Sequence, residues 1–171
     1  MKLVEITHSI LELKVNPGDY CIDMTIGNGW DTLHLSTLVG DEGRVFGFDV
    51  QRQAILNTED KLSSSAKFNN VKIFNCCHSK FQELIPIRLK GRIQAITFNL
   101  GYLPGSDKTI TTKADTTLAT LSNACNWMNA SGIVTIIGYR GHRGGETEVT
   151  TLLKWLSTSP YKSTVLSLIH I

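Results

Sequence analysis

The amino-acid sequence predicts a single α/β domain built around a Rossmann-like, doubly wound and mainly parallel sheet. Short apolar runs rich in β-branched and aromatic residues alternate with longer runs of helical period along all 171 residues. Turn-forming residues separate these runs, and no repeat or linker divides residues 1–171. Because connections between parallel strands are right-handed and helices cover both faces of such sheets, this alternation favours one sheet between two helical layers.

The short apolar runs locate the expected strands, and the runs of helical period locate the expected helices. Runs typical of buried strands cover residues 20–24, 44–49, 71–74, 93–98, 133–137 and 164–169. Apolar residues at helical spacing predict helices over residues 3–13, 30–39, 51–62, 78–84, 114–128 and 146–156. Residues 3, 6, 10 and 13 form the expected apolar face of the first helix. Gly40 and residues 129–132 supply helix-ending turns, and Pro86 stops the short helix before it.

Composition and charge exclude several classes of protein. The chain is 42% hydrophobic and 19% charged, which is ordinary for a globular domain. No run approaches the roughly 18 apolar residues of a membrane span, so we expect a cytoplasmic protein. Four cysteines without a C-x-x-C pair favour reduced thiols over zinc ligands or disulfides, and we expect no metal site. A net charge of +2 neither requires nor excludes a nucleic-acid partner.

A glycine-rich turn at residues 27–29 follows the first expected strand, where doubly wound sheets bind their ligands. Asp49 ends the second strand, and its carboxylate can accept hydrogen bonds from both hydroxyls of an adenosine ribose. Thr32 replaces the third glycine of a dinucleotide-binding turn, and Asp31 places a carboxylate where a pyrophosphate would lie. These residues favour S-adenosylmethionine, which carries an ammonium and a sulfonium, over a nicotinamide cofactor. A plain βα turn is the alternative, in which Asp31 only complements the helix dipole.

Three later loops carry further candidate residues. His78 follows the third strand, where it would contact an adenine or ribose edge or merely cap a turn. Asn99 ends the fourth strand and can orient an amine nucleophile toward a methyl donor, or cap its loop. Tyr102 can stack on a base or pack the loop, and the glycine-rich residues 138–145 can contact phosphate and a flipped base. We assign no role to the remaining histidines, which are His8, His34 and His170.

Four motifs together resemble one family of methyltransferases. They are D-M-T-I-G-N-G-W-D-T at 23–32, G-F-D-V-Q at 47–51, N-L-G-Y-L-P-G at 99–105 and Y-R-G-H-R-G-G at 139–145. In this order, over nearly the whole chain, they are similar to the bacterial class I methyltransferases called rRNA methylases, the YtqB/MnmM-like group. The resemblance implies a Rossmann-like methyltransferase fold, S-adenosylmethionine as cofactor and tRNA as substrate. The implied reaction methylates the aminomethyl nitrogen of wobble 5-aminomethyl-2-thiouridine in the anticodon region.

The resemblance also implies the residues of the site. The expected cofactor-binding residues are Asp23, Thr25, Gly27, Asn28, Gly29, Asp31, Thr32, Asp49, Gln51, His78, Asn99 and Gly101. The expected catalytic residues are Asn99, Tyr139 and His142, with His142 the first candidate for a general base and Tyr139 the second. The basic residues expected to contact phosphate are Lys108, Lys113, Arg140 and Arg143.

Two features depart from the family pattern. Trp30 stands where relatives carry histidine, which leaves the glycines of the turn unchanged. Relatives continue past the last expected strand, whereas this sequence ends at Ile171, so we expect either a shortened sequence or a sheet without its final strand. An exposed edge at residues 164–169 would favour pairing with another chain, and the two subunits of a homodimer could then share one tRNA.

Three alternatives to the tRNA reaction remain open. A methyltransferase of this fold could act on rRNA or on a small molecule. An NAD(P)-dependent oxidoreductase uses the same kind of sheet and would be stabilised by a different cofactor. A non-catalytic nucleotide-binding module would bind S-adenosylmethionine and transfer nothing.

Overall fold

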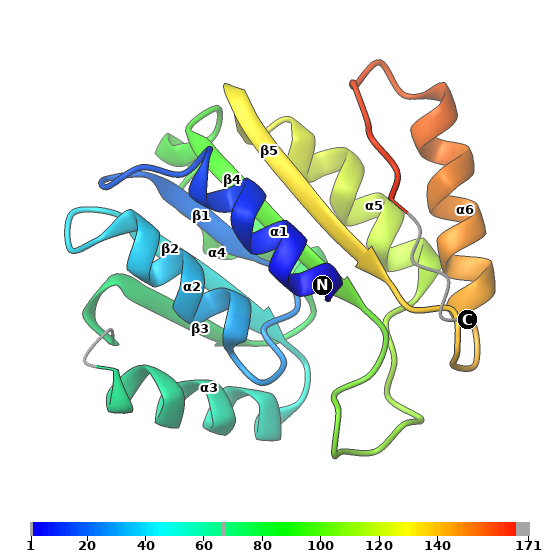
Figure 1. The fold of residues 1–171 in the computed structure, drawn as a ribbon, viewed down its shortest axis with the longest axis horizontal. Helices are drawn as coiled ribbons and strands as arrows, with labels where there is room; N and C mark the ends of the chain where they lie inside the picture. The colour runs from blue at the N-terminus through cyan, green and yellow to red at the C-terminus, as the bar shows by residue number, and fades with distance from the viewer. Residues whose placement is uncertain (1, 66–67, 167–171) are drawn as a thin grey trace.

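A five-stranded parallel sheet forms the centre of the computed structural model, which describes residues 2–65 and 68–166 (Figure 1). Its order is β3-β2-β1-β4-β5, and every neighbouring pair of strands is parallel. The strands are β1 (Tyr20–Asp23), β2 (Arg44–Asp49), β3 (Val71–Asn75), β4 (Ile93–Leu100) and β5 (Met128–Gly138). The strand order reverses between β1 and β4, which is where ligands of doubly wound sheets bind. The predicted doubly wound, parallel arrangement is confirmed.

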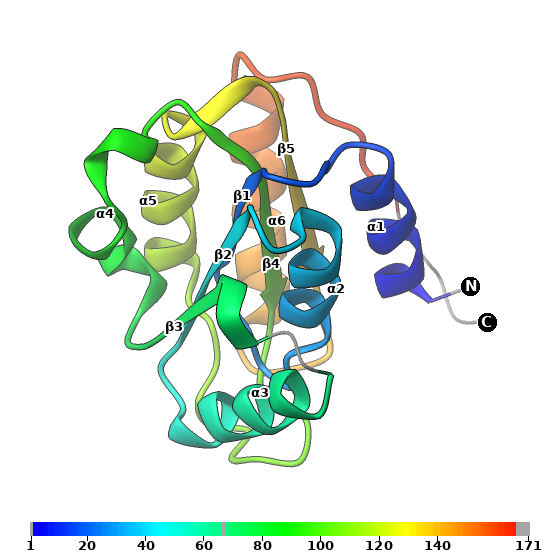
Figure 2. The same cartoon turned by 90° about the vertical axis from the view of Figure 1, so that its left-hand side faces the viewer.

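Helices cover both faces of the sheet. They are α1 (Leu3–Glu12), α2 (Trp30–Val39), α3 (Arg52–Ser64), α4 (Phe81–Leu84), α5 (Ala114–Cys125) and α6 (Gly145–Thr158). α1 and α2 lie on one side of the sheet, and α4 and α5 lie on the other (Figure 2). α6 packs against α5 and β5. Among the described helices, none combines the length and apolar character needed to cross a membrane.

Two apolar clusters fix the helices on the sheet. On the α4 and α5 side, Phe48, Phe98 and Trp127 are at most 1% exposed and belong to one cluster. On the other side, Leu11 of α1 and Leu35 of α2 are fully buried against β1 and β2. Each large apolar side chain buried in this way contributes about 1.5–3 kcal/mol. Because both faces are covered, the loops at the strand ends are held in place from both sides.

The helix predicted over residues 114–128 is too long, because α5 ends before Trp127. Residues 129–132, which were predicted to form a turn, belong to β5. Trp127 explains the difference, since its side chain is 1% exposed and its carbonyl accepts hydrogen bonds from the N–H groups of Gly91 and Ile93. These bonds bring the chain beside β4 and start the strand earlier than the apolar pattern predicts.

The prediction of a strand over residues 164–169 is wrong for residues 164–166, which the structure describes. Residues 162–166 have no regular secondary structure, and residues 167–169 lie outside the described part of the chain. Tyr161 stacks on Trp155 of α6 with ring centroids 6.1 Å apart, so the chain leaves α6 by packing on that helix. The segment then crosses to the side of the sheet that carries α1 (Figure 2). Within the described residues, β5 is an edge strand that pairs only with β4.

Candidate active site

A cleft of about 1070 Å³ is formed by the loops at the carboxyl ends of the five strands. The predicted site residues that line it are Thr25, Gly27, Asn28, Asp31, Asp49, Gln51, His78, Asn99, Gly101, Tyr139 and His142. Three predicted residues, Asp23, Gly29 and Thr32, are buried and do not line it. Val4 of α1 also lines the cleft, so the N-terminal helix forms part of its wall. The parallel sheet therefore brings together residues from four distant motifs and from the N-terminal helix.

The glycine turn after β1 is shaped by close packing. Gly29 has φ of 76° at the N-cap of α2, and a Cβ atom there would lie 2.8 Å from the Oγ1 atom of Thr58. Only glycine combines this left-handed backbone with such a close approach. Gly27, with φ of 50°, turns its N–H toward β2 and donates a hydrogen bond to Oδ2 of Asp49 at 3.1 Å. The turn thus ties β1, α2 and β2 together at the cleft.

Asp49 ends β2 with both carboxylate oxygens bonded to the backbone. Oδ2 accepts from Gly27, and Oδ1 accepts from the N–H of Gln51 at 2.9 Å. Burial raises the pKa of Asp49, and these backbone hydrogen bonds oppose that change. Each carboxylate oxygen can accept more than one hydrogen bond, so the group retains capacity for hydroxyl donors in the cleft.

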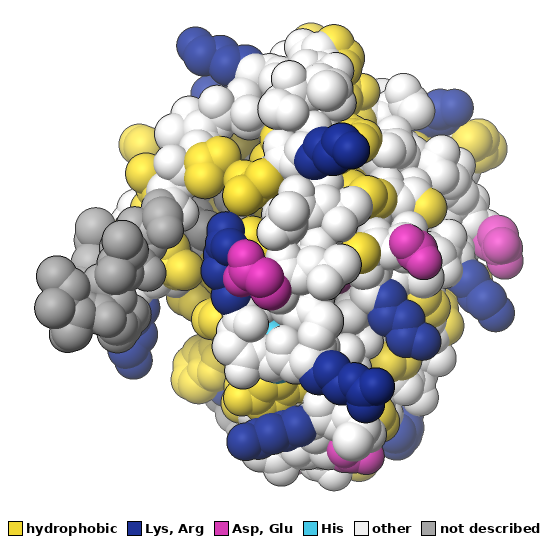
Figure 3. All heavy atoms as spheres, turned by 90° about the vertical axis from the view of Figure 1, so that its right-hand side faces the viewer, with side chains coloured by type: hydrophobic (Ala, Val, Ile, Leu, Met, Phe, Trp, Pro, Cys, Tyr) yellow, Lys and Arg dark blue, Asp and Glu magenta, His cyan; other side chains and the backbone are white. Residues whose placement is uncertain are grey.

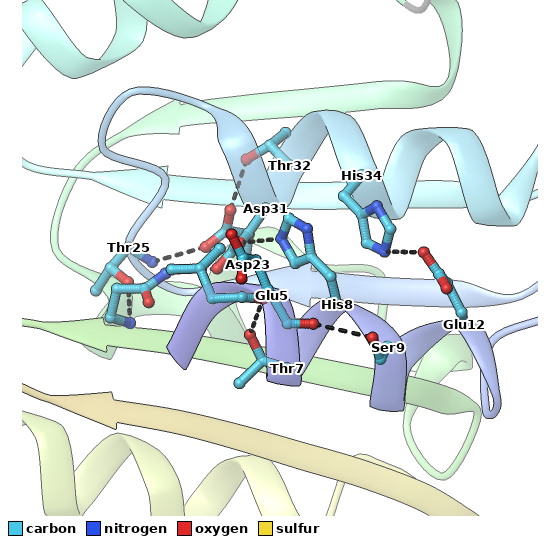
Figure 4. A network of polar contacts seen from close by, with 12 residues as sticks. Glu5, Thr7, His8, Ser9, Glu12, Asp23, Thr25, Asp31, Thr32 and His34 are labelled. Atoms are coloured by element: carbon cyan, nitrogen blue, oxygen red, sulfur yellow. Dashed lines mark hydrogen bonds and ion pairs between the residues drawn. The ribbon is translucent and has the colours of Figure 1, made fainter. Parts of the chain in front are cut away.

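Asp23 and Thr32 support the turn from inside the protein. Asp23 is fully buried, and its Oδ2 accepts a 2.6 Å hydrogen bond from the Thr32 hydroxyl. Its Oδ1 accepts a 3.2 Å hydrogen bond from the N–H of Thr25 (Figure 4). Burial and the negative charge of Asp31 raise the pKa of Asp23 to about 7. The Thr25 hydroxyl in turn accepts from the N–H of Asn99 at 2.7 Å, which joins the turn to β4.

Asp31 in the first turn of α2 is held between two other elements. Its side chain lines the cleft although the residue is only 6% exposed. Oδ2 accepts a 2.5 Å hydrogen bond from Nδ2 of Asn99 on β4. Oδ1 lies 2.6 Å from Nε2 of His8 on α1 (Figure 4). A buried carboxylate of this kind needs such donors, because an uncompensated charge is costly to bury.

His8 contacts the cleft residue Asp31, a connection that the sequence pattern did not predict. The prediction used residues 3, 6, 10 and 13 as the apolar face of the first helix, but Leu13 is 84% exposed whereas Leu11 is fully buried. His8 lies three residues before Leu11 and four after the cleft residue Val4, so helical spacing from either one places it on the buried side. That spacing is the only signal in the sequence that could have found it.

Three polar atoms at the cleft have no hydrogen-bond partner among the described residues. They are Oδ1 of Asn99, Nε2 of His142 and Nε2 of His78. His78 is 7% exposed, and burial lowers the pKa of its imidazole. Buried polar atoms are normally paired, so three unpaired ones lining one cleft indicate a place for a polar ligand.

The loops after β4 and β5 form the other half of the cleft. Tyr139 is 47% exposed, and burial together with the charge of Asp31 raises the pKa of its phenol. The rings of Tyr102 and His142 meet edge to face with centroids 6.0 Å apart. Of the residues predicted to contact phosphate, two line the cleft, Lys113 and Arg140, and two do not, Lys108 and Arg143. Arg140 forms an ion pair with Glu146.

Glu148 of α6 anchors the loop after β4. It is 2% exposed and accepts 2.7 Å hydrogen bonds from the hydroxyls of Thr112 and Thr117. Thr112 lines the cleft, whereas Thr117 belongs to α5. One buried carboxylate therefore joins the loop to two helices, a link that the apolar pattern of α6 did not reveal.

The cysteines and acidic residues offer little to a metal ion. Among the residues that the structure describes, no group of three or more His, Cys, Asp or Glu side chains could hold one. The cysteines are free thiols at Cys21, Cys76, Cys77 and Cys125. Cys76 and Cys77 line the cleft beside His78.

The fold and the cleft together define the class of protein. A parallel sheet in the order β3-β2-β1-β4-β5 carries a glycine turn after β1 and a carboxylate at the end of β2. Two further carboxylates, Asp23 and Asp31, flank the turn where a dinucleotide-binding fold would receive a pyrophosphate. This is the arrangement of the Rossmann-like class I methyltransferases, which the solved structures of similar sequences share.

The chain belongs to the family described as "Putative rRNA methylase", whose model matches residues 45–170. A structure from Clostridium thermocellum described as a "putative rRNA-methylase" is 36% identical, with a TM-score of 0.87, and the match covers 93% of this chain and 83% of that one. A methyltransferase structure from Streptococcus mutans, solved in complex with S-adenosylhomocysteine, is 30% identical, with a TM-score of 0.80, over 92% of this chain and 82% of that one.

A relative with a named substrate comes from Arabidopsis thaliana. It is called a chloroplastic tRNA (mnm5s2U34)-methyltransferase and is 39% identical over 156 residues. The match covers 86% of this chain but 56% of that protein, so the chain spans about half the length of this curated relative.

Proposed function

We propose that this protein uses S-adenosylmethionine to methylate the aminomethyl nitrogen of wobble 5-aminomethyl-2-thiouridine in tRNA. The family and the name of the Arabidopsis relative support the reaction and the substrate. The bound S-adenosylhomocysteine in the Streptococcus mutans relative supports the cofactor. A cytoplasmic location and a homodimer that shares one tRNA belong to the same proposal.

The donor half of the cleft, which we define as the loops after β1, β2 and β3 with Asp31 and the buried Asp23, fits S-adenosylmethionine better than a nicotinamide dinucleotide. Asp31 offers a carboxylate to an ammonium group, and Asp49 offers one to ribose hydroxyls. Asp31 would repel a pyrophosphate, which needs free N–H groups or cations, whereas a carboxylate at the position of Asp49 suits the ribose of either cofactor. The N–H of Gly27 is already engaged by Asp49, which removes a donor that a phosphate would need. The NAD(P)-dependent alternative is therefore disfavoured by charge.

The observation that carries the proposed reaction is the unpaired Oδ1 atom of Asn99. Its amide nitrogen donates to the carboxylate of Asp31 at 2.5 Å, which fixes the orientation of the amide because a carboxylate only accepts. The oxygen is buried at the cleft and has no partner in the described part of the chain. An amine N–H is the donor it lacks, and accepting it would orient the nitrogen lone pair for attack.

In this reaction the residues of the cleft position the substrate amine and accept the proton that it loses. S-adenosylmethionine supplies an electrophilic sulfonium methyl when it is bound. The apolar lining of the cleft favours the uncharged form of the substrate amine, because burial disfavours a cation. His142 is the better base, since its Nε2 is buried and unpaired among the described residues. The raised pKa of Tyr139 keeps its phenol protonated at neutral pH, so this residue is suited to donate a hydrogen bond.

Charge and aromatic exposure support an RNA partner at the acceptor half of the cleft, which we define as the end of β4 and the loops after β4 and β5. Lys113 and Arg140 line the cleft there, beside the half-exposed Tyr139. Figure 3 shows Lys and Arg side chains spread over the face that carries α6, with exposed hydrophobic groups between them. Such interleaving suits phosphate contacts combined with stacking on unpaired bases.

The deciding experiment identifies the methylated nucleoside. We expect the protein, given methyl-labelled S-adenosylmethionine and tRNA that carries 5-aminomethyl-2-thiouridine, to produce labelled 5-methylaminomethyl-2-thiouridine, detected by nucleoside mass spectrometry. The matched control is the same tRNA with an unmodified wobble uridine, which offers no amine and should stay unlabelled. Label in rRNA or in a small molecule instead would replace the substrate, and binding without any transfer would identify a non-catalytic module.

A further inference from the structure

α1 carries a polar network that reaches the donor half of the cleft from outside the strand loops. Nε2 of His8 lies 2.6 Å from Oδ1 of Asp31 (Figure 4), and Val4 one turn earlier lines the cleft. A carboxylate can only accept a hydrogen bond, so Nε2 of His8 carries the hydrogen. Asn99 donates to the other oxygen, and the carboxylate is therefore held by two donors from two different elements.

The imidazole of His8 is itself held in place. Its ring stacks on the ring of His34 in α2, with centroids 3.9 Å apart and an interplanar angle of 3°. Nε2 of His34 lies 3.7 Å from Oε1 of Glu12, which places a carboxylate of α1 on the far side of the stack (Figure 4). His8 thus lies between a stacked ring and the buried Asp31, and few of its rotamers are compatible with both contacts.

We propose that His8 is a positioning residue for the amino-acid end of the methyl donor. It fixes the Asp31 carboxylate so that the remaining acceptor capacity of that group is presented to the donor ammonium. This inference rests on the proposed function, because it takes the donor to be S-adenosylmethionine. It makes α1 a component of the binding site, in addition to its role in covering the sheet.

The test compares two ligands that differ only at the amino-acid end. S-adenosylhomocysteine carries the ammonium and carboxylate, whereas 5′-methylthioadenosine lacks both and keeps the adenosine and the sulfur. In calorimetric titrations we expect His8→Leu to weaken S-adenosylhomocysteine binding by about 10- to 100-fold, the range for a hydrogen bond to a charged group. Binding of 5′-methylthioadenosine should stay unchanged, and His8→Gln, which retains an N–H donor, should recover most of the lost affinity.

Controls separate positioning from folding. Ser9→Ala, on the exposed side of the same helix, should leave both affinities unchanged. Equal weakening of both ligands by His8→Leu would mean that the side chain only supports the fold, and would overturn the inference, as would unchanged binding of both. Failure of the wild-type protein to bind S-adenosylhomocysteine would instead overturn the proposed function, and that titration is made before any variant is examined.

Discussion

The two halves of the cleft differ in how their polar groups are satisfied. In the donor half, Asp23, Asp31 and Asp49 are buried or partly buried, and every one of them accepts hydrogen bonds from the protein. In the acceptor half, Oδ1 of Asn99 and Nε2 of His142 are buried without a partner in the described chain. The carboxylates of the donor half are therefore satisfied without a ligand, whereas Nε2 of His78 beside them and two groups of the acceptor half are left for a ligand to pair.

Substitutions in the two halves of the cleft should therefore have different effects. A substitution in the donor half breaks contacts within the protein, so stability and donor affinity should change together. A substitution in the acceptor half removes groups that only the substrate uses, so turnover or RNA affinity should change while the fold persists. Asn99 belongs to both halves, because its amide nitrogen serves Asp31 and its oxygen is left for the acceptor.

Asn99→Ala should have the largest effect. We expect the single-turnover rate constant, measured with saturating S-adenosylmethionine and tRNA, to decrease by about 100- to 1000-fold, the usual cost of losing one preorganised hydrogen-bonding group. Saturation removes any change in donor affinity from the measurement. Asn123→Ala on the exposed side of α5 is the matched control. A rate constant equal to that of the wild-type protein would exclude Asn99 from the acceptor half.

Asp49→Ala should come next, and it should lower donor affinity and stability without changing tRNA affinity. Removing the carboxylate takes away the acceptor for ribose hydroxyls and leaves the N–H groups of Gly27 and Gln51 without their partner. We expect S-adenosylhomocysteine to bind about 100-fold more weakly in calorimetry, while tRNA affinity stays unchanged. The surface variant Asp41→Asn should bind normally. Donor affinity that survives Asp49→Ala would contradict the assignment of the donor half.

The positions of the residues that follow β1 and β2 could be predicted, because they are set by local geometry. A glycine turn, a strand end and the first turn of a helix lie within a few residues of one another, and their order along the chain already implies their places. Gly27, Asp31 and Asp49 therefore appeared at the cleft as expected. The parallel strands explain why these residues lie close together, because the carboxyl ends of parallel strands meet at one edge of the sheet.

Contacts between distant elements could not be predicted in the same way. The hydrogen bond from His8 to Asp31 depends on how α1 packs on α2, and the bonds to Glu148 depend on how α6 packs beside α5. Burial of Trp127 likewise ended α5 early, and residues 129–132, which the sequence predicts as a turn, belong to β5. In each case a tertiary contact outweighed the local pattern.

Asp23 should make the stability of the ligand-free protein depend on pH. Its folded pKa of about 7 lies above the ordinary value of 3.8, so the folded state binds the proton more tightly than the unfolded state. The contribution of Asp23 to the free energy of unfolding should therefore decrease as pH rises from 4 through 7, by on the order of a few kcal/mol, and level off above, while the lowered pKa of His78 acts in the opposite direction. Urea unfolding of Asp23→Asn should lack this decrease, and parallel curves for variant and wild type would contradict the raised pKa.

Glu148→Ala tests whether the acceptor half needs an internal anchor. The hydroxyls of Thr112 and Thr117 would lose their shared acceptor, and we expect the free energy of unfolding in urea to decrease by about 2 kcal/mol. Donor affinity should not change, because no donor-half residue contacts Glu148 through these bonds. Glu42→Ala in an exposed turn is the control. A loss of donor affinity in Glu148→Ala would show that the two halves are coupled.

The smallest effect is expected for the arginines of the loop after β5. Replacing both Arg140 and Arg143 with alanine removes two cations, and we expect tRNA to bind about tenfold more weakly at low salt. The slope of log affinity against log salt concentration should become shallower by about 1 to 2, since each phosphate contact contributes roughly 0.7 to 0.9. The matched double variant Arg88→Ala with Lys90→Ala removes two exposed cations just before β4, at the end of the sheet away from the cleft. Equal effects of the two double variants would mean that the net charge of the protein attracts tRNA. Arg140 and Arg143 would then not be specific phosphate contacts.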